Sequence, residues 1–267
     1  IITPARLHFG FLELSNNYGS KFGGIGLSID KFQTKIVVKK STKMEFKGKV
    51  SKKALFFLKK FSKKKRIKPN FSVNIEKTTP QHIGLGSGTQ LALSIGTAIS
   101  YLNDMNLNSD EIAKMLNRGL RSRIGLIGFN QGGFLIDLKI KNKFNTNIGK
   151  VCFPEEWKII LIKDVNQGLH GKKEMNAFEN LKNLKKSSID LTSLVLLEIY
   201  PSLIENNFSK FSKAITKLQN QMGKKFQAFQ GGKFSSKISY KILKSYGYSN
   251  FIVYDNELDQ VNTDELE

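Results

Sequence analysis

The first 80 residues carry apolar side chains at two different spacings. Residues 2–9, 35–39 and 71–75 show the alternating spacing of half-buried β-strands. Residues 51–61 instead place Leu55, Leu58 and Phe61 at helical spacing between paired lysines, which predicts a surface helix. Residues 22–29 are rich in glycine and predict an extended stretch that approaches other backbone closely. The chain therefore begins with mainly β structure.

A glycine-rich loop stands directly before the next helical pattern. The loop comprises Gly84, Leu85, Gly86, Ser87, Gly88, Thr89 and Gln90. Three glycines in five residues let backbone N–H groups turn toward a ligand, and the start of a helix adds about half a positive charge, so phosphate suits this loop. The loop is not a Walker A motif, and it lacks the third glycine of a dinucleotide-binding fingerprint. An ordinary strand-to-helix turn therefore explains the spacing equally well.

The rest of the chain mixes helical and extended patterns. A short helix is predicted over residues 109–116, with Ser109 as its N-cap, and a strand over residues 134–140. After a polar connection, the pattern predicts a second lobe. Its expected elements are a strand over 158–163, helices over 171–182, 189–199 and 205–221, a further helix after Gly232, and a strand over 251–254. This mixed order predicts an α+β protein with two lobes, over residues 1–150 and 151–267.

Composition limits the class of protein. With 40% apolar and 24% charged residues, the chain is typical of a folded globular protein. No apolar run approaches the roughly 20 residues that cross a bilayer, so no membrane partner is expected. The single cysteine, Cys152, allows no internal disulfide, and no zinc-ligand spacing is present. With no visible signal peptide, these features favour a cytoplasmic location.

The net charge of +21 raises the alternative of a nucleic-acid-binding protein. Fifteen basic residues fall in 35–70, beside the single acid Glu45. However, 38 of the 43 basic residues are lysines, whereas nucleic-acid readers usually depend on arginine for bidentate and stacking contacts. We therefore expect small-molecule substrates rather than nucleic acid.

The few arginines are more informative than the lysines. Arg6, Arg118, Arg121 and Arg123 lie near glycine segments, where a planar guanidinium could grip phosphate or carboxylate. The alternative is an exposed helix end rich in cations. His8 and His82 are candidate site residues, although a lone histidine is more often structural. Asp137 could hold Mg²⁺ or simply face solvent.

Six segments, in order, resemble the GHMP kinase superfamily. Within it they resemble the beta-ribofuranosylaminobenzene 5'-phosphate synthases of methanopterin biosynthesis. The segments are Pro4 to Gly10, Phe22 to Leu27, His82 to Gln90, Arg121 to Gly125, Gln131 to Phe134 and Gln230 to Phe234. The resemblance implies an N-terminal α+β lobe and a C-terminal ferredoxin-like lobe, with the ligand cleft between them.

Two departures from the kinase pattern bear on the chemistry. GHMP kinases typically read Gly-Leu-Gly-Ser-Ser-Ala, whereas Gly88 and Thr89 stand here at the last two positions. Gly125 stands where many of these kinases carry a catalytic aspartate. A hydroxyl acceptor would lack its usual base, although some kinases of the superfamily manage without one. A GHMP-type ATP-dependent small-molecule kinase therefore stays open as the alternative.

The resemblance implies that phosphoribosyl diphosphate condenses with 4-aminobenzoate, releasing diphosphate and carbon dioxide, with Mg²⁺ as cofactor. It implies that the loop Gly84, Leu85, Gly86, Ser87, Gly88, Thr89 and Gln90 binds phosphate. Arg6, His8, Arg121 and Arg123 are the expected catalytic residues. Gly23, Gly24, Gln230, Gly231 and Gly232 are expected to bind substrate. A homodimer stays open.

The C-terminal part departs from the family. The family normally ends in a Gly-Gln-Ser-Ser-Trp-Gly-Pro loop, whereas residues 248–254 here lead directly into an acidic tail. Either the chain is a fragment or frame-disrupted product, or its cleft and activity have changed. The C-terminal lobe is therefore expected to be incomplete.

Overall fold

The computed structural model describes residues 1–12, 23–80, 84–120, 122–138, 151–161, 191–230 and 232. Five strands in this part of the chain form one sheet. They are β1 (Ile2–Phe11), β2 (Gly24–Lys40), β3 (Glu45–Gly48), β4 (Phe71–Lys77) and β5 (Phe134–Asp137). The sheet order is β1-β2-β4-β3, with β5 paired to β2. The β3–β4 pair is parallel and the other pairs are antiparallel.

The strand β2 is the long central member of the sheet. Its first half pairs with β1 and β5, and its second half pairs with β4. The sequence predicted two separate extended stretches here, over 22–29 and 35–39. In the structure the two stretches belong to one strand. The pairing with β1 shifts its register between Thr3 and Ala5, and this irregularity accommodates the β2 residues that lie between the two stretches.

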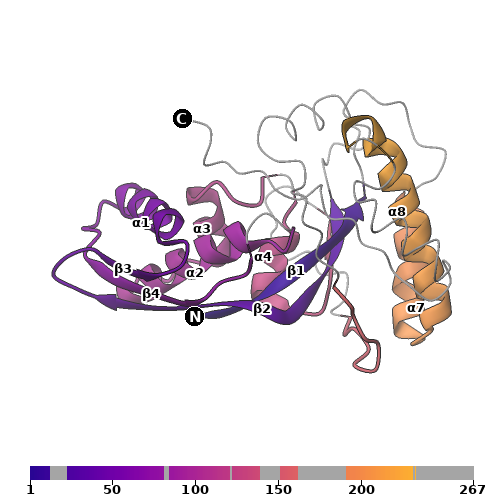
Figure 1. Cartoon of the computed structure of the whole chain (residues 1–267), viewed down its shortest axis with the longest axis horizontal. Helices are drawn as coiled ribbons and strands as arrows, with labels where there is room; N and C mark the ends of the chain where they lie inside the picture. The colour runs from indigo at the N-terminus through magenta and orange to yellow at the C-terminus, as the bar shows by residue number, and fades with distance from the viewer. Residues whose placement is uncertain are drawn as a thin grey trace.

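Four helices pack on one side of the sheet: α1 (Ser51–Lys65), α2 (Ser87–Leu102), α3 (Ser109–Met115) and α4 (Ile124–Gln131). Figure 1 shows α1 and α2 near β3 and β4, and α4 near β1 and β2, while α3 packs on α1, α2 and α4. Phe57 and Phe61 of α1 share a buried core with Ile95 of α2 and with Ile36 and Val73 of the sheet. The helix predicted over residues 51–61 is therefore confirmed. Leu58 and Phe61 of the predicted spacing are buried with Ala54 and Phe57, whereas Leu55 is half-buried.

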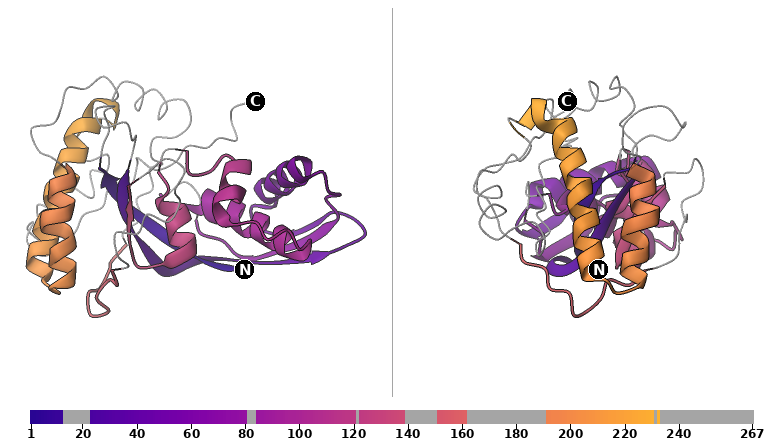
Figure 2. Two further views of the ribbon diagram at one scale, coloured as in Figure 1. Left: turned by 180° about the vertical axis from the view of Figure 1, so that it is seen from behind. Right: turned by 90° about the vertical axis from the view of Figure 1, so that its right-hand side faces the viewer.

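The second group of helices covers the other face of β1. It comprises α6 (Leu191–Leu194), the π-helical turn η1 (Val195–Ile199), α7 (Tyr200–Ile204) and α8 (Phe208–Gln230). Figure 2 shows α7 and α8 side by side in front of the strands. Leu7 and Phe9 of β1 form a core with Phe211 and Leu218 of α8. Because side chains alternate across a strand, Arg6 and His8 point away from this core, toward α4.

Several details differ from the sequence prediction. Neither β3 nor α4 was predicted, and α8 extends well beyond the predicted 205–221. Asn108, not Ser109, caps α3: its side chain accepts from the N–H groups of Asp110 and Glu111, completing a capping box. The predicted strand over 158–163 was wrong for residues 158–161, which are irregular.

The strand predicted over 134–140 ends at Asp137, and the helix predicted over 189–199 is α6 followed by η1. The predicted elements at 171–182 and 251–254, the helix after Gly232 and the connection 141–148 lie outside the described residues. Among the helices that the structure describes, none is long and apolar enough to cross a membrane.

Candidate active site

The glycine loop leads into α2, as the sequence predicted. Gly84 and Gly86 have φ of 70° and 75°, in the left-handed region that favours glycine. Gly86 is the N-cap of α2, and no side chain caps the helix. The backbone N–H groups of Thr89 and Gln90 both donate to the Gly86 carbonyl at 3.1 Å. The N–H groups of Ser87 and Gly88 come before these two in the first turn of α2. They therefore lie at the N-terminal end of the helix, where the helix itself provides no acceptor.

Arg6 holds this loop from β1. Its Nη1 donates to the Gly84 carbonyl at 2.9 Å, and its backbone N–H donates to the Leu85 carbonyl at 3.2 Å. A Cβ placed on Gly86 would lie 3.0 Å from both Cγ and Nε of Arg6. The side chain is only 6% exposed. Gly86 is therefore needed for the close approach of Arg6 as well as for its backbone conformation.

The loop is also joined to α4 through Gly125. Gln90 Nε2 donates to the Gly125 carbonyl at 2.8 Å, and both residues are buried. A Cβ placed on Gly125 would lie 3.3 Å from Thr89 Cγ2 and 3.7 Å from Arg6 Nε. Two of the three positions that depart from the kinase pattern, Thr89 and Gly125, are therefore neighbours in the structure. Thr89 fills part of the space that a side chain at residue 125 would need.

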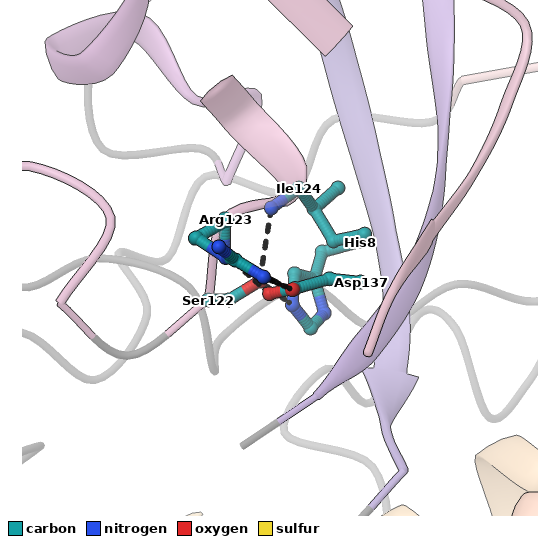
Figure 3. A network of polar contacts seen from close by, with 5 residues as sticks. All are labelled: His8, Ser122, Arg123, Ile124 and Asp137. Carbon is teal, nitrogen blue, oxygen red and sulfur yellow. Dashed lines mark hydrogen bonds and ion pairs between the residues drawn. The ribbon is translucent and has the colours of Figure 1, made fainter. Parts of the chain in front are cut away.

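His8 lies on the same side of β1, beside the start of α4. Its Nε2 is 2.9 Å from Ser122 Oγ, which also accepts a hydrogen bond from the backbone N–H of Ile124 at 3.3 Å (Figure 3). The imidazole packs against the Phe11 ring, with 4.7 Å between ring centroids. Contacts with Ser122 and Phe11 therefore orient a buried histidine.

An ion pair lies next to this histidine (Figure 3). Asp137, at the end of β5, is fully buried. Its Oδ1 accepts from Nε and Nη2 of Arg123 at 3.1 and 3.0 Å, and its Oδ2 accepts from the Arg123 backbone N–H at 2.7 Å. The expectation that Asp137 could face solvent was wrong. The pair fastens the start of α4 to β5, because β5 supplies the carboxylate and the residue before α4 supplies all three donors.

Asp137 is the candidate magnesium ligand. Among the described residues, no group of three His, Cys, Asp or Glu side chains could hold a metal ion. Asp137 already accepts three hydrogen bonds from Arg123. Both of its oxygens are thus engaged with a cation, which disfavours a second cation at the same carboxylate.

One carboxyl near the site has a shifted pKa. Burial raises the pKa of Asp110, at the start of α3, above its ordinary value, and the charges of Arg123 and Lys114 act in the opposite direction. The charge of Arg123 therefore acts on Asp110 as well as on its partner Asp137.

Arg118, which follows α3, is also buried, and its guanidinium lies over the Phe57 ring, 4.7 Å from the centroid.

The predicted substrate-binding glycines allow close backbone packing. A Cβ on Gly23 would lie 2.6 Å from the Asp137 carbonyl oxygen, and one on Gly24 would lie 3.2 Å from His8 Nε2. Gly232 follows α8 and donates its N–H to the Gln227 carbonyl at 3.2 Å. Gln230 is the last residue of α8. Arg121, His82 and Gly231, and the side chain of Gln230, lie outside the described part of the structure.

Sequence reasoning missed two residues, Ser122 and Lys53. Ser122, which contacts His8, lies within the segment Arg121 to Gly125, but nothing in the sequence assigned it a role. Lys53, whose Nζ lies 3.5 Å from the position of a Cβ on Gly88, is one of many lysines between residues 35 and 70 and had no distinguishing sequence signal. The arginines, in contrast, stood out because the chain otherwise uses lysine.

Comparison with known proteins identifies the fold. Residues 49–134 match the family described as the GHMP kinases N terminal domain. A solved mevalonate kinase superposes with a TM-score of 0.60 at 16% identity, covering 96% of this chain and 88% of that one. The mevalonate kinase of Methanococcus jannaschii gives a TM-score of 0.55 at 18% identity, covering 96% and 87%. At these identities the likeness is one of fold: the chain has the α+β fold of the GHMP kinases.

Two relatives identify the enzyme family within this fold. A Methanocaldococcus jannaschii protein named beta-ribofuranosylphenol 5'-phosphate synthase is 31% identical over 252 residues, covering 82% of this chain and 76% of that protein. An Archaeoglobus fulgidus protein of the same name is 27% identical over 245 residues, covering 86% and 78%. The chain belongs to this family of 5'-phosphate synthases, which confirms the enzyme class expected from the sequence. The names specify a phenol, whereas the sequence resemblance implied an aminobenzene product.

Proposed function

We propose that this protein transfers the 5-phosphoribosyl group of phosphoribosyl diphosphate to a ring carbon of a 4-substituted benzoate. The observation that carries this proposal is the close approach of Thr89 to the position that a side chain at residue 125 would occupy. At the position where many GHMP kinases keep a catalytic carboxylate, this chain has a glycine, and the neighbouring threonine fills part of the space. The loop that suits phosphate is retained while the usual base for a hydroxyl acceptor is not.

The reaction requires the site to stabilise a leaving diphosphate. As the bond between the ribose C1 and the diphosphate oxygen breaks, C1 gains oxocarbenium character and negative charge develops on the diphosphate. The N–H groups of Ser87 and Gly88 and the positive end of α2 would offset that charge. Arg6 contributes by holding the loop, since it donates to the Gly84 carbonyl and packs on Gly86.

The acceptor needs no protein nucleophile. The ring carbon that carries the carboxylate attacks C1 with its π electrons, and the C–CO₂ bond then breaks. Its electron pair returns to the ring as carbon dioxide leaves, so the ring becomes aromatic again. An electron-donating 4-substituent makes this carbon more nucleophilic. Both amino and hydroxyl groups do so, hence 4-aminobenzoate and 4-hydroxybenzoate are the two acceptors to compare.

Different observations support the two acceptors. The six sequence segments support 4-aminobenzoate, as in methanopterin biosynthesis. The names of the relatives contain phenol, which supports the 4-hydroxy acid.

We further propose that Mg²⁺ accompanies the donor diphosphate, because Mg²⁺ commonly binds substrate phosphates with few protein ligands. A cytoplasmic location is proposed from the free, exposed Cys152.

The test combines the protein with Mg²⁺, phosphoribosyl diphosphate and each acceptor in turn, and measures diphosphate and carbon dioxide release. With the true acceptor, we expect diphosphate and carbon dioxide to be released in equal amounts. The ratio of kcat/KM between the two acceptors then identifies the substrate. A parallel reaction with ATP and small alcohols such as mevalonate is the control. ATP-dependent phosphorylation without ribosyl transfer would refute the synthase proposal in favour of the kinase alternative.

A further inference from the structure

Two cationic side chains converge on Gly88, in the first turn of α2. A Cβ placed on Gly88 would lie 3.5 Å from both Cε and Nζ of Lys53, and 3.6 Å from Nη1 of Arg118. Lys53 lies in the first turn of α1, and Arg118 follows α3. Two segments far apart in the sequence, the start of α1 and the residues after α3, therefore bring cationic side chains to one point of the loop.

Arg118 is held firmly in this place. It is 9% exposed, its guanidinium lies over the Phe57 ring, and its backbone N–H donates to the Ala113 carbonyl at 2.7 Å. Lys53 is half-buried, whereas its neighbour Lys52 is exposed. A fixed guanidinium next to an ammonium group is well suited to an anion with several oxygens, because the guanidinium offers paired donors and the ammonium offers a compact charge.

The two sides of the loop differ in what occupies them. On one side, Arg6 fills the space against Gly86 at 3.0 Å. On the other side, Gly88 is only half-buried, and the nearest atoms to its Cβ position are the charged ends of Lys53 and Arg118. The backbone N–H groups of Ser87 and Gly88 also lie at this end of α2, which carries the positive end of the helix dipole. The Gly88 side of the loop is therefore the side on which two cationic side chains lie.

We propose that Lys53 and Arg118 form a clamp that binds the diphosphate group of the sugar donor against Gly88. This inference rests on the proposed function, since phosphoribosyl diphosphate carries two separate anionic groups, the diphosphate and the 5-phosphate. The diphosphate is the group that the clamp takes, because it develops negative charge as it leaves and the clamp adds two cations to the positive end of α2. Lys53 therefore has a specific role among the surface lysines.

The test measures equilibrium binding of inorganic diphosphate and of ribose 5-phosphate by calorimetry, in the presence of Mg²⁺. Lys53→Met keeps most of the aliphatic stem and removes the charge, and Lys52→Met is the matched control on the same helical turn. We expect Lys53→Met to weaken diphosphate binding at least tenfold, as for loss of a charged hydrogen bond. Ribose 5-phosphate binding should change less than twofold, and Lys52→Met should change neither.

Arg118→Lys is the second variant, because it keeps the charge but loses the paired donors and the stacking on Phe57. Its folding is checked by thermal melting, and Lys53→Met carries the test if Arg118→Lys melts early. Unchanged diphosphate affinity in Lys53→Met, or no diphosphate binding by the unaltered protein, overturns the clamp. A larger loss for ribose 5-phosphate than for diphosphate also overturns the assignment. Because binding is measured without turnover, an intact clamp in a protein that transfers no ribosyl group would leave the clamp standing and refute only the reaction.

Discussion

The methyl group of Thr89 lies 3.3 Å from the point that a Cβ at Gly125 would occupy. This separation is tighter than ordinary van der Waals contact, so a side chain at residue 125 and the threonine at residue 89 compete for space. Both positions differ from the usual kinase pattern. Their proximity gives a physical reason for the two departures to occur together.

The first prediction concerns this contact. Gly125→Val should lower the free energy of unfolding by about 1–3 kcal/mol, because added methyl groups overpack a closely packed site. Thr89→Ala in the same chain should recover part of that loss, with a coupling energy of at least about 0.5 kcal/mol. Urea unfolding of the two single variants and the double variant measures the coupling. Strictly additive effects would show that the two residues do not compete for space.

The second prediction separates folding from binding within the loop. Gly86→Val should destabilise the protein by more than about 1 kcal/mol, since the residue has φ of 75° and its Cβ would meet Arg6 at 3.0 Å. Gly88→Ala should fold normally, because its Cβ finds ordinary contact distances. Gly88→Ala should nevertheless weaken diphosphate binding.

Thermal melts and diphosphate titrations of both variants test this distinction. Tight diphosphate binding by a fully folded Gly88→Ala protein would contradict binding of the diphosphate against Gly88. A Gly86→Val protein as stable as the original would contradict the packing role of Arg6.

The third prediction concerns the buried pair of Arg123 and Asp137. Asp137→Asn should destabilise the protein by about 3–5 kcal/mol, because it leaves the guanidinium buried without its carboxylate. Arg123→Lys should cost less, because it keeps the charge and the backbone hydrogen bond but loses the two side-chain hydrogen bonds from Nε and Nη2. Denaturant unfolding measures both. Equal and negligible effects would mean that the pair does not fasten α4 to β5.

The fourth prediction concerns pH. Because burial raises the pKa of Asp110 in the folded protein, the folded state binds this proton more tightly than the unfolded state. The contribution of Asp110 to stability is therefore greatest below the ordinary aspartate pKa and declines as pH rises through the raised value. Relative to the original protein, Asp110→Asn should become progressively more stable over that pH range. A constant difference in unfolding free energy between pH 3 and pH 7 would contradict the shift.

The sequence by itself determined much of the local structure. The spacing of apolar residues predicted β1, α1 and β4, and the three closely spaced glycines predicted the loop that opens α2, because both patterns depend on neighbouring residues. The order of six short segments was also sufficient to predict the family and its α+β fold. These features depend on residues close together in the chain, or on motifs that keep their spacing.

The tertiary structure decided which distant residues meet. The alternating pattern around Asp137 could not distinguish a solvent-facing side chain from one paired with Arg123, because both sides of β5 are buried by elements elsewhere in the chain. Likewise, nothing in the run of lysines set Lys53 apart, since its position opposite Gly88 depends on how α1, α2 and the end of α3 pack together. Such contacts arise only from packing between segments, and therefore only the folded chain brings Lys53 and Arg118 to the loop.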